Sequence, residues 1–199
     1  MLSTEKIRLD LNTKCMGQNI IYLPETGSTN QDAWEHIENG CANGTLIITD
    51  YQQKGRGRRQ NIWDATPGKS LTFSFVLYPE NNLDKLALFP LLTGLSIVKG
   101  IESAAFIKIG LKWPNDIMLS RKKMGGILIE SKIISNRLSI VVGIGLNIND
   151  SIADFSEEIK DTATSLKIYT EESHSCEQIL AEILNEFEIL YYDNWDTII

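Results

Sequence analysis

A short run of basic and glycine residues, at positions 54–59, is the part of the sequence best suited to binding an anion. It reads Lys-Gly-Arg-Gly-Arg-Arg and follows a predicted strand whose end carries Gln52. Each arginine offers a planar fork of donors for phosphate or carboxylate oxygens, and glycine lets backbone N–H groups approach the same oxygens. The composition of the run alone leaves a solvated basic loop as an equal alternative.

Two common phosphate-binding motifs are excluded near this loop. Gly55 and Gly57 begin the glycine pattern of a dinucleotide-binding turn, but Gln60 occupies its last glycine position and no helix follows. The Gly-Lys-Ser run that begins at Gly68 resembles the end of a P-loop, but Trp63 stands where that motif needs its first glycine. A nucleotide would therefore be held in another way.

Three further segments carry residue types that a ligand site needs. Residues 112–116 read Lys-Trp-Pro-Asn-Asp and predict a turn that presents oxygen atoms, although for this segment alone a plain β-turn is the better explanation. Residues 123–130 place a lysine and two glycines at the start of an apolar strand, and residues 143–147 read Gly-Ile-Gly-Leu-Asn. Each segment alone is explained by a turn or a bulge. Together with the basic loop they indicate one ligand site.

The elements that must position these residues follow from periodicity and turn signals. Period-two alternation and turn residues predict strands at 19–23, 45–53, 70–77, 107–113, 117–131 (with a turn around 120–122) and 137–148. Helical spacing and capping residues predict helices at 28–39, at 84–102 with a kink at Pro90, and at 176–199. Closely spaced strands in the middle, flanked by helices, indicate an α+β fold. We expect a mixed, mostly antiparallel sheet with helices packed on one face.

Composition narrows the class of protein. The chain has 199 residues, a net charge of −7 and three widely spaced cysteines, which fit neither a disulfide framework nor a metal knuckle. The acidic balance disfavours a nucleic-acid partner, and no apolar stretch reaches the length of a membrane span. We therefore expect a single domain over 1–199 in the cytoplasm, with no membrane partner.

The segments at 26–30, 51–59, 112–116, 123–128 and 143–147 resemble, in this order, the signature segments of the biotin protein ligases. The resemblance spans most of that family's catalytic domain. It implies a fold like that of class II aminoacyl-tRNA synthetases and biotin ligases. It also implies a form without an amino-terminal helix-turn-helix, whose small carboxy-terminal β-barrel is absent or truncated.

The resemblance implies an ATP-dependent ligase with biotin and ATP as substrates and Mg²⁺ as a cofactor. Such an enzyme forms biotinyl-5'-AMP and then transfers biotin to a lysine of a carrier protein, such as the biotin carboxyl carrier subunit of acetyl-CoA carboxylase. Biotin's carboxylate is ionised at neutral pH and needs no base. The obstacle is the approach of two anions, so cations and fixed donors are the groups that the chemistry requires.

The resemblance also implies roles for individual residues. The implied catalytic residues are Lys123, Arg58 and Arg56. The implied biotin-binding residues are Ser28, Thr29, Asn30, Gln52, Gly55, Arg56, Gly57, Arg58, Lys123, Gly126, Gly143 and Gly145. The implied ATP- and adenylate-binding residues are Arg58, Arg59, Trp63, Asn115, Asp116, Lys123 and Asn147. Asp116 is the implied Mg²⁺ ligand. Trp63 and Asn147 would hold the adenine, and the glycines would leave room for biotin.

Other interpretations stay open at this point. A lipoate or octanoate ligase or transferase shares the fold and the acyl chemistry, although the basic loop and the 112–116 turn favour biotin. A non-catalytic biotin-binding module and a nucleic-acid-binding module are alternatives from another class. A homodimer is open as well. His36 and His174 lie far apart in the sequence, and we expect neither to bind a metal or act in catalysis.

Overall fold

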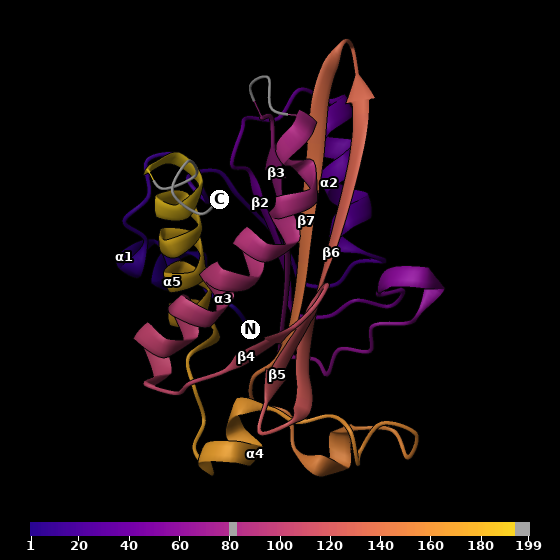
Figure 1. Ribbon diagram of the computed structural model, residues 1–199, viewed down its shortest axis with the longest axis vertical. Helices are drawn as coiled ribbons and strands as arrows, with labels where there is room; N and C mark the ends of the chain where they lie inside the picture. Colours follow the sequence, from indigo (N-terminus) through magenta and orange to yellow (C-terminus); the bar gives the residue numbers. More distant parts are fainter. Residues whose placement is uncertain (80–82, 194–199) are drawn as a thin grey trace.

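The computed structural model of the chain describes residues 1–79 and 83–193. Its centre is a seven-stranded sheet in the order β1-β2-β3-β7-β6-β5-β4 (Figure 1). The strands are β1 (Ile20–Leu23), β2 (Leu46–Thr49), β3 (Ser70–Leu77), β4 (Gly110–Lys112), β5 (Asp116–Leu119), β6 (Lys122–Ile134) and β7 (Arg137–Asn147). Only the β1–β2 pair is parallel among these strands. The predicted α+β fold with a mixed, mostly antiparallel sheet is confirmed.

The two faces of the sheet differ in character because side chains alternate along each strand. In β3, Phe73 and Phe75 belong to the main hydrophobic core, whereas the alternate residues Thr72 and Ser74 are buried polar groups on the other face. In β7, Gly143 and Gly145 pair with Ser74 and Thr72 and extend this small, polar surface. The apolar face therefore forms the core, and the opposite face offers room for a ligand.

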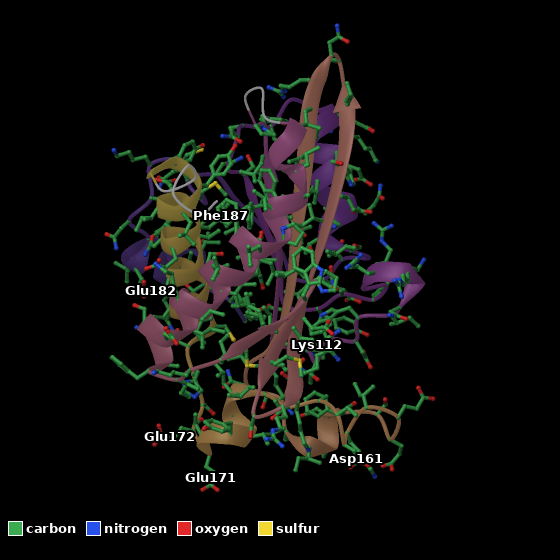
Figure 2. The ribbon with its side chains drawn as sticks, viewed as in Figure 1. Lys112, Asp161, Glu171, Glu172, Glu182 and Phe187 are labelled. Atoms are coloured by element: carbon green, nitrogen blue, oxygen red, sulfur yellow. The ribbon has the colours of Figure 1, made fainter. Side chains whose placement is uncertain are left out.

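Helices cover both faces (Figure 1). The helices α3 (Phe89–Ala105) and α5 (Cys176–Glu188) pack on the apolar face, and α1 (Thr4–Asp10) packs against α5. Phe187 of α5 lies on its inner side, fully buried against Phe75, and Glu182 points away from the sheet (Figure 2). The helix α2 (Thr29–Glu38) differs from the predicted packing on one face. It lies on the polar face, where Ile47, Val76 and Val141 form a second apolar patch beneath it.

Several element boundaries differ from the predicted ones for local reasons. Pro90 does not kink a helix but lies in the first turn of α3, where proline is tolerated. The 3-10 turn Leu83–Leu88 ends just before α3 begins. The helices α1 and α4 (Leu166–Thr170) were not predicted, since their seven and five residues are too few for a clear periodicity. The helix α5 passes into a π turn, Ile189–Asp193, and the rest of the predicted 176–199 helix lies outside the described residues.

One apolar helix corrects the expectation from sequence that no stretch is long enough to span a membrane. Within residues 1–79 and 83–193, the segment Leu86–Ala105 is long and apolar enough by length and composition. In the fold this segment packs against α5 and β6, as a core helix does. The cysteines Cys15, Cys41 and Cys176 are free.

Candidate active site

A cavity of about 300 Å³ opens on the polar face of the sheet, between the first turn of α2, the basic loop and the β4–β5 turn. The predicted site residues that line it are Ser28, Thr29, Asn30, Gln52, Arg56, Gly57, Arg58, Arg59, Trp63, Asn115, Asp116, Lys123, Gly126, Gly143 and Gly145. Segments separated by more than a hundred positions therefore meet at one place. The volume lies at the lower end of the range typical of small-molecule sites.

The three cations singled out in the sequence all line this cavity, and each has a polar partner. Lys123 Nζ lies 2.6 Å from Asp116 Oδ1, and Arg58 Nη1 donates to Asn115 Oδ1 at 3.1 Å. Asn115 belongs to the turn that joins β4 to β5, whose Trp113–Pro114 peptide bond is cis, and Asp116 is the first residue of β5. The Arg56 guanidinium lies 3.7 Å from the carboxylate of Glu130 in β6. The cations are thus gathered and oriented by neighbours.

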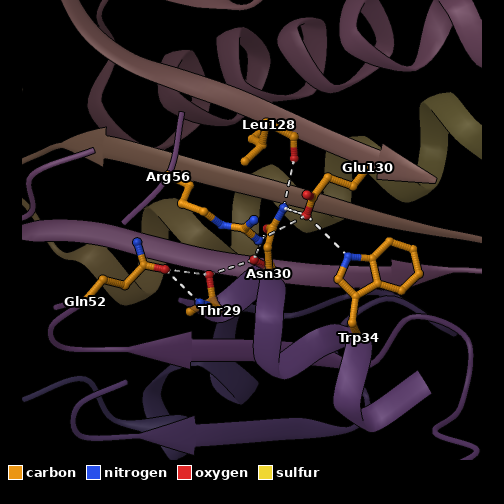
Figure 3. Close-up of polar contacts among 8 residues, drawn as sticks. Thr29, Asn30, Trp34, Gln52, Arg56, Leu128 and Glu130 are labelled. Carbon is orange, nitrogen blue, oxygen red and sulfur yellow. Dashed lines mark hydrogen bonds and ion pairs between the residues drawn. The ribbon is translucent and has the colours of Figure 1, made fainter. Parts of the chain in front are cut away.

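At the other end of the cavity, the start of α2 forms a buried polar cluster (Figure 3). The Thr29 backbone N–H donates to Gln52 Oε1 at 2.7 Å, so a glutamine side chain satisfies a free donor of the helix's first turn. Ser28 is the N-cap residue, but its side chain makes no capping hydrogen bond. Ser28 is 7% exposed, and its hydroxyl is free to bind a ligand.

The glycines make room chiefly for site side chains. A Cβ atom on Gly143 would lie 2.1 Å from Asn30 Oδ1, and one on Gly145 would lie 2.4 Å from the Trp63 ring. Gly126 differs, because its Cβ would meet nothing closer than the Lys123 side chain at 3.8 Å. The expectation that all three leave room for biotin itself therefore applies directly to Gly126 alone.

Two buried polar atoms at the cavity have no hydrogen-bond partner in the described part of the chain, namely Trp63 Nε1 and Thr72 Oγ1. Leaving such groups unpaired is unfavourable by about 1–3 kcal/mol each, and a ligand with matching atoms would remove that penalty. Thr72 was not predicted as a site residue. Its position two residues before Ser74, on the same strand face, is the signal that could have found it.

Glu130 was also missed. Its Oε2 atom accepts from Asn30 Nδ2 at 2.9 Å and from Trp34 Nε1 at 3.3 Å, besides its contact with Arg56. The signal in the sequence is a single glutamate in the apolar run of β6. Other lining residues that were not predicted come from the basic loop, the turn and the strands: Asn61, Ile62, Pro114, Ile127, Leu128 and Ile144.

Two predicted residues do not line the cavity. Asn147 Nδ2 donates to the Thr164 carbonyl at 3.1 Å, so its amide nitrogen binds a neighbouring loop. Gly55 packs against the backbone of Trp63, where a Cβ atom would lie 2.2 Å from the Trp63 carbonyl oxygen. Gly55 thus allows the basic loop to fold back on itself.

Neither histidine enters the site. His36 lies in the last turn of α2, and His174 Nε2 contacts Thr170 Oγ1 at 2.8 Å. Among residues 1–79 and 83–193, no group of three or more histidine, cysteine, aspartate or glutamate side chains is placed to hold a metal. A divalent ion at Asp116 would depend on phosphate oxygens for its remaining ligands.

Comparison with known proteins identifies the family to which this fold and cavity belong. The model of the biotin/lipoate A/B protein ligase family matches residues 22–147, more than half of the chain. The chain therefore belongs to the biotin/lipoate A/B protein ligase family.

Individual relatives are biotin ligases. The chain is 39% identical over 193 residues to the bifunctional ligase/repressor BirA of Bacillus spizizenii, covering 96% of this chain and 59% of that protein. It is 29% identical over 171 residues to the biotin–[acetyl-CoA-carboxylase] ligase of Mycobacterium tuberculosis, covering 83% of this chain and 61% of the relative. The chain thus spans about three fifths of the length of these two relatives.

A solved structure agrees. The biotin protein ligase from Aquifex aeolicus in complex with biotin and ATP superposes with a TM-score of 0.76 at 32% identity, covering 91% of this chain and 75% of that one.

Proposed function

We propose that this chain is the catalytic part of an ATP-dependent biotin protein ligase. In the first step the biotin carboxylate attacks the α-phosphate of ATP, giving biotinyl-5'-AMP and pyrophosphate. In the second step a carrier lysine attacks the acyl carbon and AMP leaves. The observation that carries the proposal is that Arg56, Arg58 and Lys123 line one cavity with a buried polar cluster at its end.

The arrangement suits the first step because the barrier is largely electrostatic. Lys123 and Arg58 enter the cavity beside the β4–β5 turn, where their charges can offset those of a carboxylate and a phosphate brought together. The cluster of Ser28, Thr29 and Gln52 offers hydrogen-bonding groups for the ureido ring of biotin. The Trp63 ring, beside Gly145, offers a flat surface for the adenine.

Mg²⁺ enters the proposal as an ion shared with ATP. The side-chain oxygens of Asp116 and Asn115 would hold it, and it would supply charge neutralisation at the phosphates. Asp116 is paired with Lys123, so an ion at Asp116 would free the ammonium for the substrate.

A lipoate ligase of the same family is the second candidate. The polar cluster favours biotin, because a ureido ring uses buried donors and acceptors that a dithiolane ring would leave unpaired. The carrier proposed is the biotin carboxyl carrier domain of a biotin-dependent carboxylase. The cytoplasmic location, the single-domain organisation, a homodimer and the lack of nucleic-acid and membrane partners stay predictions from the sequence.

One experiment tests the proposal. The protein is mixed with ATP, Mg²⁺, a biotin carrier domain and either biotin or lipoate, and the carrier mass and AMP are measured. We expect one biotin per carrier and AMP only when biotin is present. Modification by lipoate alone would support the second candidate, and biotin binding without AMP would indicate a non-catalytic module. A carrier whose acceptor lysine is replaced by arginine is the control.

A further inference from the structure

Glu130 does not line this cavity, yet it contacts Asn30 and Arg56 of the site and Trp34 of α2 (Figure 3). Its Oε2 atom accepts from Asn30 Nδ2 at 2.9 Å and from Trp34 Nε1 at 3.3 Å, and it lies 3.7 Å from Arg56 Nη2. A carboxylate is an acceptor only. The amide group of Asn30 must therefore turn its NH₂ toward Glu130 and its oxygen toward Ser74.

The direction fixed at Asn30 passes to Thr29 through Ser74. The Ser74 hydroxyl donates to Asn30 Oδ1 at 2.7 Å, which uses its single proton. The Ser74 oxygen lies 2.7 Å from Thr29 Oγ1 and must accept in that contact. That contact uses the single proton of the Thr29 hydroxyl, so its 3.1 Å approach to Gln52 Oε1 is a secondary contact. Ser74 does not line the cavity, so with its proton on Ser74 the Thr29 hydroxyl turns oxygen lone pairs toward a ligand.

The orientation of the Gln52 amide group is fixed independently of Glu130. Its Oε1 atom accepts from the Thr29 backbone N–H at 2.7 Å, so its NH₂ group is turned the other way. This NH₂ makes no hydrogen bond within the described residues. Besides the Ser28 hydroxyl, this end of the cavity thus presents a donor on Gln52 and an acceptor on Thr29. A ureido ring has a carbonyl acceptor beside N–H donors, which is the complementary pattern.

We propose that Glu130 is a positioning residue that makes Thr29 an acceptor and so selects a ligand with an N–H group at that point. The inference rests on the proposed function, since biotin is the ligand that it concerns. Without the carboxylate, the NH₂ group of Asn30 keeps only its 3.4 Å contact with the Leu128 carbonyl. The amide could then reverse, Ser74 would accept from it and donate its own proton to Thr29, and the Thr29 proton would be released from Ser74 toward Gln52 Oε1 or the cavity.

The test is a double-mutant cycle on biotin binding, measured by titration calorimetry. Glu130→Met removes the acceptor, and Thr29→Val removes the hydroxyl through which Glu130 is proposed to act. We expect each single change to raise the Kd of biotin by about fivefold, as for one ordinary hydrogen bond. We expect the double variant to be no weaker than about fivefold, because both changes interrupt one path. Additive effects, with a Kd raised by about 25-fold, would overturn the inference.

Glu130→Gln separates the proposed role from a merely structural one. Its amide oxygen can still accept from Asn30 and Trp34, so we expect a biotin Kd close to that of the unsubstituted protein. Binding as weak as in Glu130→Met would overturn the inference. Glu157→Met, at a side chain that is 85% exposed, is the control for the same chemical change.

Two further measurements keep the outcomes distinct. The Kd of ATP and the melting temperature report whether Glu130→Met is folded. If it is not, Ser74→Ala interrupts the same path at its middle and must show the same non-additivity with Thr29→Val. An unsubstituted protein that binds no biotin would overturn the proposed function together with this inference, whereas additivity in folded variants overturns the inference alone.

Discussion

Lys123 and Arg58 reach the cavity already oriented by the β4–β5 turn. Lys123 pairs with Asp116 at 2.6 Å, yet its side chain is 45% exposed, so the pair is accessible to a substrate. An exposed ion pair contributes little to stability, about 0–1 kcal/mol. The value of these pairs therefore lies in placing charge where two anions meet.

Lys123→Ala should lower the rate of adenylate formation by on the order of 10²-fold or more, because a charge in the cavity is lost. Pyrophosphate exchange with biotin and ATP measures this step. The neighbouring exposed residue gives the control, and Lys122→Ala should keep the normal rate. Normal exchange by Lys123→Ala, with an unchanged melting temperature, would remove Lys123 from the mechanism.

Arg58→Ala should release biotinyl-adenylate faster, by about tenfold, since its guanidinium would no longer close the loop over the intermediate through Asn115. Stopped-flow dilution of a preformed complex measures the release rate. Arg121→Ala, at an exposed turn position, is the matched control. An unchanged release rate would contradict the role of the basic loop as a cover.

At the scale of elements, the site exists because α2 lies against the polar face of the sheet. Gly143 of β7 and Asn30 of α2 meet where a Cβ atom would come within 2.1 Å of the amide oxygen. The helix can approach the strand this closely because Gly143 has no side chain. The hydrogen bonds from Asn30 through Ser74 to Thr29 depend on that approach.

Gly143→Ala should lower the free energy of unfolding by about 1–3 kcal/mol, because Asn30 must move to make room. Gly126→Ala is the control, since its Cβ would meet nothing within 3.8 Å, and it should change stability by less than about 1 kcal/mol. Urea unfolding of both variants decides the matter. Equal free energies of unfolding for the two variants would show that α2 and β7 can move apart without loss of stability.

The 3-10 turn Ile152–Asp154 is tied to the start of β3 by Lys69, whose ammonium lies 2.6 Å from Asp154 Oδ1. This bond and those from Ser151 lower the pKa of Asp154 from 3.8 to about 2. A carboxyl with a lowered folded-state pKa adds stability above its unfolded pKa and loses it as the pH falls toward the folded value.

Asp154→Asn should therefore be less stable than the unsubstituted protein at pH 7, by about 1 kcal/mol because Lys69 is partly exposed to solvent. The difference should vanish as the pH falls from about 4 to about 2. Urea unfolding across this range measures it. The exposed Asp161, labelled in Figure 2, supplies the control variant Asp161→Asn. A stability difference between Asp154→Asn and the unsubstituted protein that persisted at pH 2 would show that the Asp154 charge is not its cause.

In the whole molecule, the main hydrophobic core and the cavity lie on opposite faces of one sheet. Phe187 is fully buried and packs edge to face on Phe75, with ring centroids 4.7 Å apart. Phe187→Ala should lower the free energy of unfolding by about 3–5 kcal/mol. While the variant is folded, its biotin Kd should be unchanged. Phe106→Ala, at a residue that is 92% exposed, should leave stability nearly unaltered, and calorimetry compares the two.

Much of the fold could be predicted from the sequence, because local patterns determine local structure. The alternation in 70–77 matches β3 at both ends, and the hairpin of β6 and β7 follows from two alternating runs with a turn between them. Pro90 was placed at a kink instead of a helix start, since a proline signals an interruption without saying on which side the helix continues.

The sequence by itself also determined which residues could do the chemistry: the arginines of the basic loop, Lys123 and the polar residues near Thr29. Tertiary structure alone decided that they share a cavity, that α2 crosses to the polar face, and that Asn147 is spent on the Thr164 carbonyl. The physical reason is range. Charge, capping and alternation act between near neighbours in the chain, whereas the contacts of Glu130 with Asn30 and Trp34 join residues about a hundred positions apart, which only packing can bring together.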